Sequence, residues 1–180
     1  MTTTIDTTSS DLASTLRRLY FVRFAFAIVW AVLMFASHSR LGPVGIALLV
    51  VYPLFDVGAA IVDSRSSRAT RGLYVNIAIS SLAAIALAFA GPSGVPTVLR
   101  VWGVWAVTSG LVQLVVGLGR RKLGGQWPMI LSGGLSVLAG ASFIAGASAA
   151  SPTLTNIAGY AVLGGIFFLI SALRLGRAAR

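Results

Sequence analysis

The chain has 180 residues, of which 57% are hydrophobic and only 10% are charged, and its mean hydropathy is +0.90. Soluble domains carry about 25% charged residues, so this composition excludes an ordinary soluble protein and indicates a membrane protein. The absence of cysteine excludes disulfides and thiolate metal sites. The net charge of +10 lies in short clusters at the ends of apolar segments, a pattern typical of membrane topology rather than of nucleic-acid binding.

Residues 1–15 are rich in Ser and Thr and are expected to form a flexible cytoplasmic tail. Six apolar segments follow, and each has about the 20 residues that a helix needs to cross the hydrocarbon core. These segments are 20–38, 43–63, 73–91, 99–118, 127–146 and 155–174, and turn-like stretches separate them. The predicted fold class is therefore an all-α integral membrane protein, with six transmembrane helices in one domain over 16–180.

The basic residues are distributed unevenly between the two sides of this predicted topology. With six spans, both termini lie on the same side as the second and fourth loops. That side holds twelve of the fourteen basic residues: Arg17, Arg18, Arg23, Arg65, Arg68, Arg71, Arg120, Arg121, Lys122, Arg174, Arg177 and Arg180. The other side holds Arg40 and Arg100. The positive-inside rule therefore places the N- and C-termini in the cytoplasm, and the Arg-, Ala- and Gly-rich composition suggests a bacterial cytoplasmic (inner) membrane.

The chain repeats itself with a period near 53 residues. The odd-numbered spans open with the aromatic residues Phe21, Tyr74 and Trp127, and the even-numbered spans carry matching aromatics at Tyr52, Trp105 and Tyr160. Regular loop lengths alone also produce even spacing, but the matching residue classes favour a true repeat. Because each unit contains two spans, successive units have the same orientation, and we expect three parallel repeats over about 16–68, 69–122 and 123–180.

The second half of the chain carries an ordered pattern of aromatic residues and glycines. Residues 100–144 read RVWGVWAVTSGLVQLVVGLGRRKLGGQWPMILSGGLSVLAGASFI, and residues 157–177 read IAGYAVLGGIFFLISALRLGR. The pattern is marked by Trp105, Ser109, Gly110, Trp127, Gly133 and Gly140, and it recurs at Tyr160, Gly164 and Gly165. In this pattern the chain resembles the HdeD-like membrane proteins, which are built from a short two-helix repeat of unknown function. The resemblance implies a six-span inner-membrane protein linked to acid or general stress tolerance, and it supplies no catalytic residues.

Asp56 lies inside the second span, seven residues from its end and thus roughly 10 Å below the cytoplasmic interface. A carboxylate at that depth is costly unless it has a partner inside the protein. Arg23, Asn76 and Gln113 lie at comparable depths in other spans. We therefore predict an intramembrane polar cluster of Asp56, Arg23, Asn76 and Gln113 that clasps helices of different repeats. The alternatives are that Asp56 takes up and releases a proton, or that it occupies an unimportant position on a tilted helix.

Small residues recur at four-residue spacing along several spans, and small residues allow helices to approach closely in lipid. Ser132, Ser136 and Gly140 form one such line, whereas Gly110 and Gly165 belong to shorter ones. We expect these residues to pack helices together, either within one bundle or between copies in a homo-oligomer.

Large aromatic residues lie near the ends of several predicted spans. They are Tyr20, Tyr74, Trp102, Trp105 and Trp127. Trp and Tyr gather at the lipid headgroups of both membrane surfaces, so these side chains are expected at that level.

Little in the sequence supports catalysis. A Ser–His–Asp set would need His38, at the outer end of the first span, to reach Asp56, and helix rise separates the two by about 20 Å. No set of zinc ligands and no P-loop is present in the sequence, so we expect no enzyme activity and no metal or cofactor.

The expected partner is the lipid bilayer, without nucleic acid. We expect a non-enzymatic role in stress tolerance through self-association, partner binding or membrane permeability; the alternative is a small proton-linked transporter or channel that uses Asp56.

Overall fold

The structure is a computed structural model that describes residues 3–37, 41–66, 71–119 and 127–178. The described residues form helices α1 (Thr3–Ala36), α2 (Pro43–Ser66), α3 (Arg71–Ala90), α4 (Val95–Gly119), α5 (Trp127–Gly146) and α6 (Thr155–Ala178), with a 3-10 turn at Gly91–Ser93. No strand occurs within these ranges. Helices satisfy their own backbone hydrogen bonds, as a lipid environment requires.

Each of the six helices is long and apolar enough to cross a membrane. The spanning segments are Ser14–Ala36, Pro43–Arg65, Arg71–Ser93, Val95–Gly119, Trp127–Gly146 and Thr155–Arg174. They match the six predicted segments to within a few residues at most ends. The predicted all-α, six-span fold class is therefore confirmed, and the protein is a multi-pass helical membrane protein.

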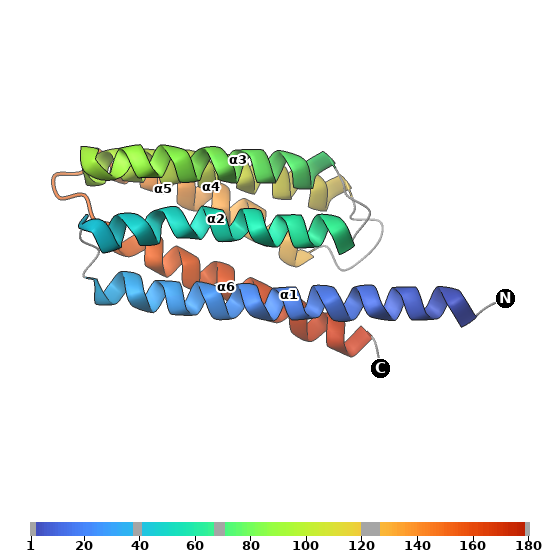
Figure 1. The fold of residues 1–180 in the computed structure, drawn as a ribbon. Coiled ribbons are helices and arrows are strands. Elements are labelled where there is room, and N and C mark those ends of the chain that lie inside the picture. Colours follow the sequence, from blue (N-terminus) through green and yellow to red (C-terminus); the bar gives the residue numbers. More distant parts are fainter. Residues whose placement is uncertain (1–2, 38–40, 67–70, 120–126, 179–180) are drawn as a thin grey trace.

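The first helix begins earlier than the sequence predicts. The backbone is helical from Thr3, in the segment 1–15 that was expected to be a flexible tail. Once the apolar span has formed a helix, each further turn adds hydrogen bonds without a new nucleation cost, which explains why the helix extends toward the N-terminus. In Figure 1 this part of α1 projects past the ends of the other helices.

The helices alternate in direction, so both ends of the chain lie at one end of the bundle (Figure 1). At the opposite end, α3 is joined to α4 by the 3-10 turn and by Gly94. Gly94 has a φ angle of +97°, a conformation that glycine adopts at little cost. This turn allows the two helices to reverse direction within a few residues.

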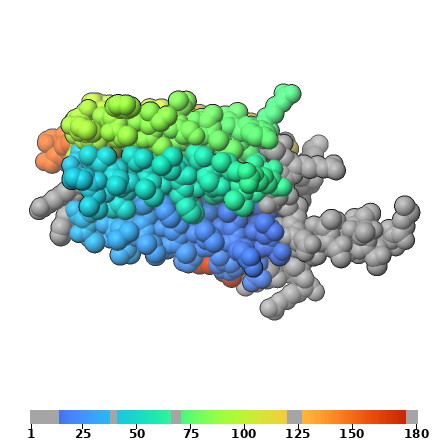
Figure 2. All heavy atoms as spheres, viewed as in Figure 1, coloured from blue at the N-terminus to red at the C-terminus, as the bar shows by residue number. Residues whose placement is uncertain are grey.

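The six helices close into a ring, because α6 packs along α1 as well as against α5. The most extensive contacts join α2 to α3, α4 to α5 and α6 to α1, and contacts within each two-helix unit are smaller. The space-filling view shows the side chains of α1, α2 and α3 meeting along one face of this ring (Figure 2). Three equivalent hairpins arranged around one axis would produce this alternation of large contacts between units and small contacts within them. The contacts therefore support the predicted repeat. That the three hairpin backbones superpose stays a prediction.

Aromatic side chains fill the core of the ring. The ring centroids of Trp30 and Tyr52 lie 4.7 Å apart, those of Trp102 and Trp105 lie 5.1 Å apart, and Trp30 stacks on Trp102 at 5.6 Å. Trp102 is fully buried and Trp105 is 7% exposed, so the expectation that both lie at the headgroups is wrong. Nearness to a span end does not decide which face of the helix turns inward, and here packing against α1 and α2 turns both indoles toward the axis.

Glycines allow the closest helix contact, between α4 and α5. A Cβ atom added at Gly140 would lie 2.6 Å from the carbonyl oxygen of Gly103, and one added at Gly110 would lie 2.8 Å from that of Gly133. At the α6–α1 contact, a Cβ at Gly165 would meet the Cβ of Ala27 at 3.2 Å. The predicted packing residues Gly110, Gly140 and Gly165 therefore lie at contacts within one bundle.

The alternating directions of the helices predict the result of a topology experiment. A reporter inserted at Ser148 and a reporter fused to the N-terminus should lie on opposite sides of the membrane, because five spans separate them. A third reporter at Ser93, three spans from the N-terminus, should share the side of Ser148 and serves as the control. If the N-terminal and Ser148 reporters fall on the same side, the count of six spans is wrong.

Candidate functional site: an intramembrane polar cluster

The side chain of Asp56 projects from α2 into the bundle and is 14% exposed. Its Oδ1 atom accepts a hydrogen bond from Nη2 of Arg23 on α1, and the two side chains form a salt bridge. The structure therefore brings together the carboxylate and the guanidinium that the sequence places at comparable depths. Each charge has its counter-ion inside the protein, which avoids the cost of facing lipid.

The second carboxylate oxygen of Asp56 is held by α3. Asn76 Nδ2 donates to Oδ2 at 2.8 Å, and Ser80 Oγ donates to the same atom at 2.8 Å. Trp105 Nε1, on α4, donates to Ser80 Oγ at 3.0 Å. An indole N–H can only donate, so the Ser80 hydroxyl oxygen accepts a hydrogen bond from Trp105. The Ser80 O–H in turn donates a hydrogen bond to Asp56.

Among the described residues, three hydrogen-bond donors and no acceptor therefore bond to the carboxylate. This arrangement complements an ionised aspartate, since a protonated one would bring a fourth hydrogen into a site made of donors. Hydrogen bonds to charged groups are also stronger than those between neutral groups. The geometry thus suits a fixed clasp between helices better than a proton acceptor.

Arg23 extends the cluster to the last helix. Its guanidinium carbon lies 4.2 Å from the centre of the Phe168 ring on α6, within the range of a cation–π contact. The interactions of Asp56 and Arg23, together with the Trp105–Ser80 bond, join α1, α2, α3, α4 and α6. The cluster therefore links residues from all three predicted repeats.

Of the four residues predicted for the cluster, Gln113 is not part of it: no hydrogen bond to Asp56, Arg23 or Asn76 is found for it in the described chain. It lies eight residues beyond Trp105, the α4 residue that reaches the cluster, and therefore about 12 Å farther along the helix. The sequence analysis also missed Ser80. Its spacing of four residues from Asn76, which puts both on one helix face, was the available signal.

The predicted packing serines lie on the other side of the ring. Ser136 on α5 is 7% exposed, and its Oγ atom shares a hydrogen bond of 3.0 Å with the Tyr160 hydroxyl on α6. Ser132 lies one turn before Ser136 and lines a groove between these two helices. Ser136 therefore contacts both neighbours of α5: its hydroxyl bonds to α6, and its Cβ would lie 2.9 Å from a Cβ added at Gly110 on α4.

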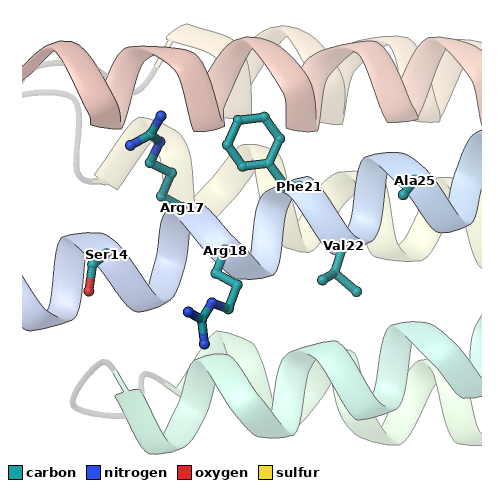
Figure 3. Close-up of a pocket in the computed structure, with 6 residues that line it drawn as sticks. All are labelled: Ser14, Arg17, Arg18, Phe21, Val22 and Ala25. Atoms are coloured by element: carbon teal, nitrogen blue, oxygen red, sulfur yellow. The ribbon is translucent and has the colours of Figure 1, made fainter.

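A second hollow, of about 440 Å³, lies along the middle of α1 and is lined by Ser14, Arg17, Arg18, Phe21, Val22 and Ala25. Figure 3 shows that Arg17 and Phe21 point to one side of the helix and that Arg18 and Val22 point to the other. The Arg17 guanidinium lies 5.6 Å from the centre of the Phe21 ring. Because these side chains diverge, the hollow does not form a converging site.

Metal and catalytic groups are scarce in the parts of the chain that the structure describes. No group of three or more His, Cys, Asp or Glu side chains comes together within those parts. His38 lies outside the described residues.

Comparisons of the chain with protein-family models, with curated proteins and with solved structures find no match. The fold and the site define the class of protein: a six-helix membrane protein with an aromatic core and, beside it, a charged polar cluster. Its function is therefore argued from its own residues.

Proposed function

We propose that this is a non-enzymatic protein of the bacterial inner membrane that contributes to acid or general stress tolerance. It would act by association within the membrane, with copies of itself or with a partner, rather than by altering membrane permeability, because aromatic side chains fill the axis of the ring. The resemblance of residues 100–177 to the HdeD-like proteins supports the stress context. The positive-inside distribution of basic residues supports cytoplasmic termini.

The filled axis of the ring is the observation that carries this proposal. Trp102 packs against both Trp30 and Trp105, and all three indoles pack against Tyr52, where a transport pathway through the ring would have to run. Transport pathways are marked by several intramembrane polar or ionisable groups that line a water-filled cavity. Here the charged groups form one closed cluster, and an aromatic core occupies the centre, which favours association over transport.

A proton-linked transporter or channel that uses Asp56 is the second candidate. The partial exposure of the Asp56 and Arg23 side chains, 14% and 17%, favours it, because the pair is not fully enclosed by the protein. The three donors around the carboxylate count against it, since they complement the ionised form.

A flux assay separates the two candidates. We expect vesicles that contain the purified protein to leak protons no faster than empty vesicles when a pH gradient is applied, because the aromatic core blocks the axis. Under the same proposal, cells that make the protein should survive acid shock better than cells that make Asp56→Ala at the same membrane level. Proton flux that is present in the natural protein and lost in Asp56→Asn would instead establish the transporter.

A further inference from the structure

A lateral groove separates α5 from α6. These two helices have the smallest contact of any neighbours in the ring, and the space between them measures about 610 Å³. That volume lies within the range of small-molecule binding sites. The groove is lined by neutral side chains, among them Phe35, Ser132, Ser142, Phe143, Asn156 and Tyr160.

At the groove, the third repeat has small residues where the first repeat has large ones. Phe26 and Trp30 of α1 pack on Tyr52 of α2, and the residues two periods later are Ser132 and Ser136. The two missing aromatic rings leave space between α5 and α6 that the corresponding pair, α1 and α2, fills with its own side chains. On α6, Gly159 widens the same space, since a Cβ at this position would meet no atom within 4 Å.

The length of the groove matches one leaflet of a bilayer. From Ser132 to Ser142 on α5 the helix rises roughly 15 Å, and from Thr155 to Phe167 on α6 it rises roughly 18 Å. The hydrocarbon core of a membrane is about 30 Å thick, so each leaflet contributes about half of that length. The groove therefore runs from the α5–α6 turn to near the middle of the membrane.

The polarity of the groove changes along its length. Thr155 and Asn156 are exposed at the turn end, where a lipid has its ester and headgroup oxygens. Farther in, the hydroxyls of Ser136 and Tyr160 bond each other, and exposed leucines such as Leu138 and Leu163 form the rims. No charged side chain is among the described residues that line it, so the groove suits a neutral, apolar chain with a polar end.

We propose that the α5–α6 groove is a binding site for one acyl chain of a membrane phospholipid. The lipid enters sideways from the leaflet at the α5–α6 turn, its chain lies along Ser136 and Tyr160, and its ester region contacts Thr155 and Asn156. This lipid takes the place of the two aromatic side chains that fill the matching space in the first repeat. The site is independent of the proposed function, because it needs neither self-association nor transport.

Photolabelling tests the site. The full-length protein is placed in vesicles of phosphatidylethanolamine and phosphatidylglycerol, with a fraction of phosphatidylglycerol that carries a diazirine midway along one acyl chain. After irradiation, mass spectrometry maps the label. We expect labelling of 132–143 and 155–167 to exceed that of the lipid-facing surface of α3, because a held chain stays near the groove longer than a passing one.

Gly159→Leu should reduce the labelling of the groove severalfold, because its side chain enters the open space. Gly58→Leu is the matched control, because a Cβ at Gly58 on α2 also meets no atom within 4 Å but Gly58 lies outside the groove. Labelling of the α5–α6 groove in this variant should equal that of the natural protein. If Gly159→Leu fails to fold, Ser132→Phe, which restores the residue of the first repeat, replaces it.

Even labelling around the ring, or labelling that Gly159→Leu leaves intact, would overturn the proposal. The mass of the protein particle in detergent tests a different occupant of the groove, a second copy of the chain. A dimer that becomes a monomer in Gly159→Leu, without strong groove labelling in the natural protein, would show that a helix of a second copy fills the groove.

Discussion

Asp56→Ala should destabilise the folded protein by about 3 kcal/mol, the lower end of the range for removal of one partner of a buried ion pair, because the Asp56–Arg23 pair is mostly but not fully buried. The substitution leaves the Arg23 guanidinium without its counter-ion inside the bundle and deprives Asn76 and Ser80 of their acceptor. It also releases a contact that joins α2 to α1 and α3. Thermal melting of the purified protein in a mild detergent measures the effect.

Ser109→Ala is the matched control, because Ser109 occupies the position of Asp56 in the second repeat. Its hydroxyl oxygen is buried and has no hydrogen-bond partner within the described structure, so its removal should change the melting temperature little. The double variant Asp56→Ala/Arg23→Met should melt above Asp56→Ala alone, because it removes the uncompensated charge. Equal melting of Asp56→Ala and Ser109→Ala would show that the pair does not clasp the helices.

Gly140→Ala should also be strongly destabilising, by about 2–3 kcal/mol, near the upper end of the range for overpacked cores. The new Cβ would lie 2.6 Å from the Gly103 carbonyl oxygen and 2.8 Å from the backbone nitrogen of Val107. Both neighbours are backbone atoms, so a side-chain rotation cannot relieve the clash, and α4 and α5 must separate. In lipid the helices have no hydrophobic drive to associate, and loss of close packing is therefore costly.

Gly58→Ala provides the comparison for Gly140→Ala. Its Cβ meets nothing within 4 Å, so the gain in helix propensity, about 0.5–1 kcal/mol, should appear as a higher melting temperature. The two Gly→Ala changes thus have opposite expected signs. Equal and small shifts for both would mean that α4 and α5 do not approach through Gly103 and Gly140.

Hydropathy and charge alone determined the secondary structure and the number of spans. A helix must be about 20 residues long to cross the hydrocarbon, so the length of each apolar segment carries the prediction without any knowledge of its neighbours. The partners of Asp56 followed from a similar one-dimensional argument. Residue rise gives the depth of Asp56, Arg23 and Asn76 along their helices, and the cost of an unpaired charge in lipid requires groups at equal depth to meet.

Rotation about each helix axis was decided only by the tertiary structure. The six spans are apolar all round, so no amphipathic face shows which residues turn inward. For this reason Trp102 and Trp105 were expected at the membrane surface, yet they lie in the core. Gln113 is a different case: the structure places it about 12 Å along α4 from Trp105, so its depth and not its rotation keeps it out of the cluster.

The closure of α6 on α1 and the groove beside α5 also depend on the assembled bundle. Which helices become neighbours is set by the fit of all six together, and a groove is the space that side chains fail to fill. Ser132 and Gly159 look in the sequence like ordinary small packing residues, similar to Gly140. Only the positions of their neighbours show that Gly140 touches another backbone, whereas Ser132 and Gly159 border open space.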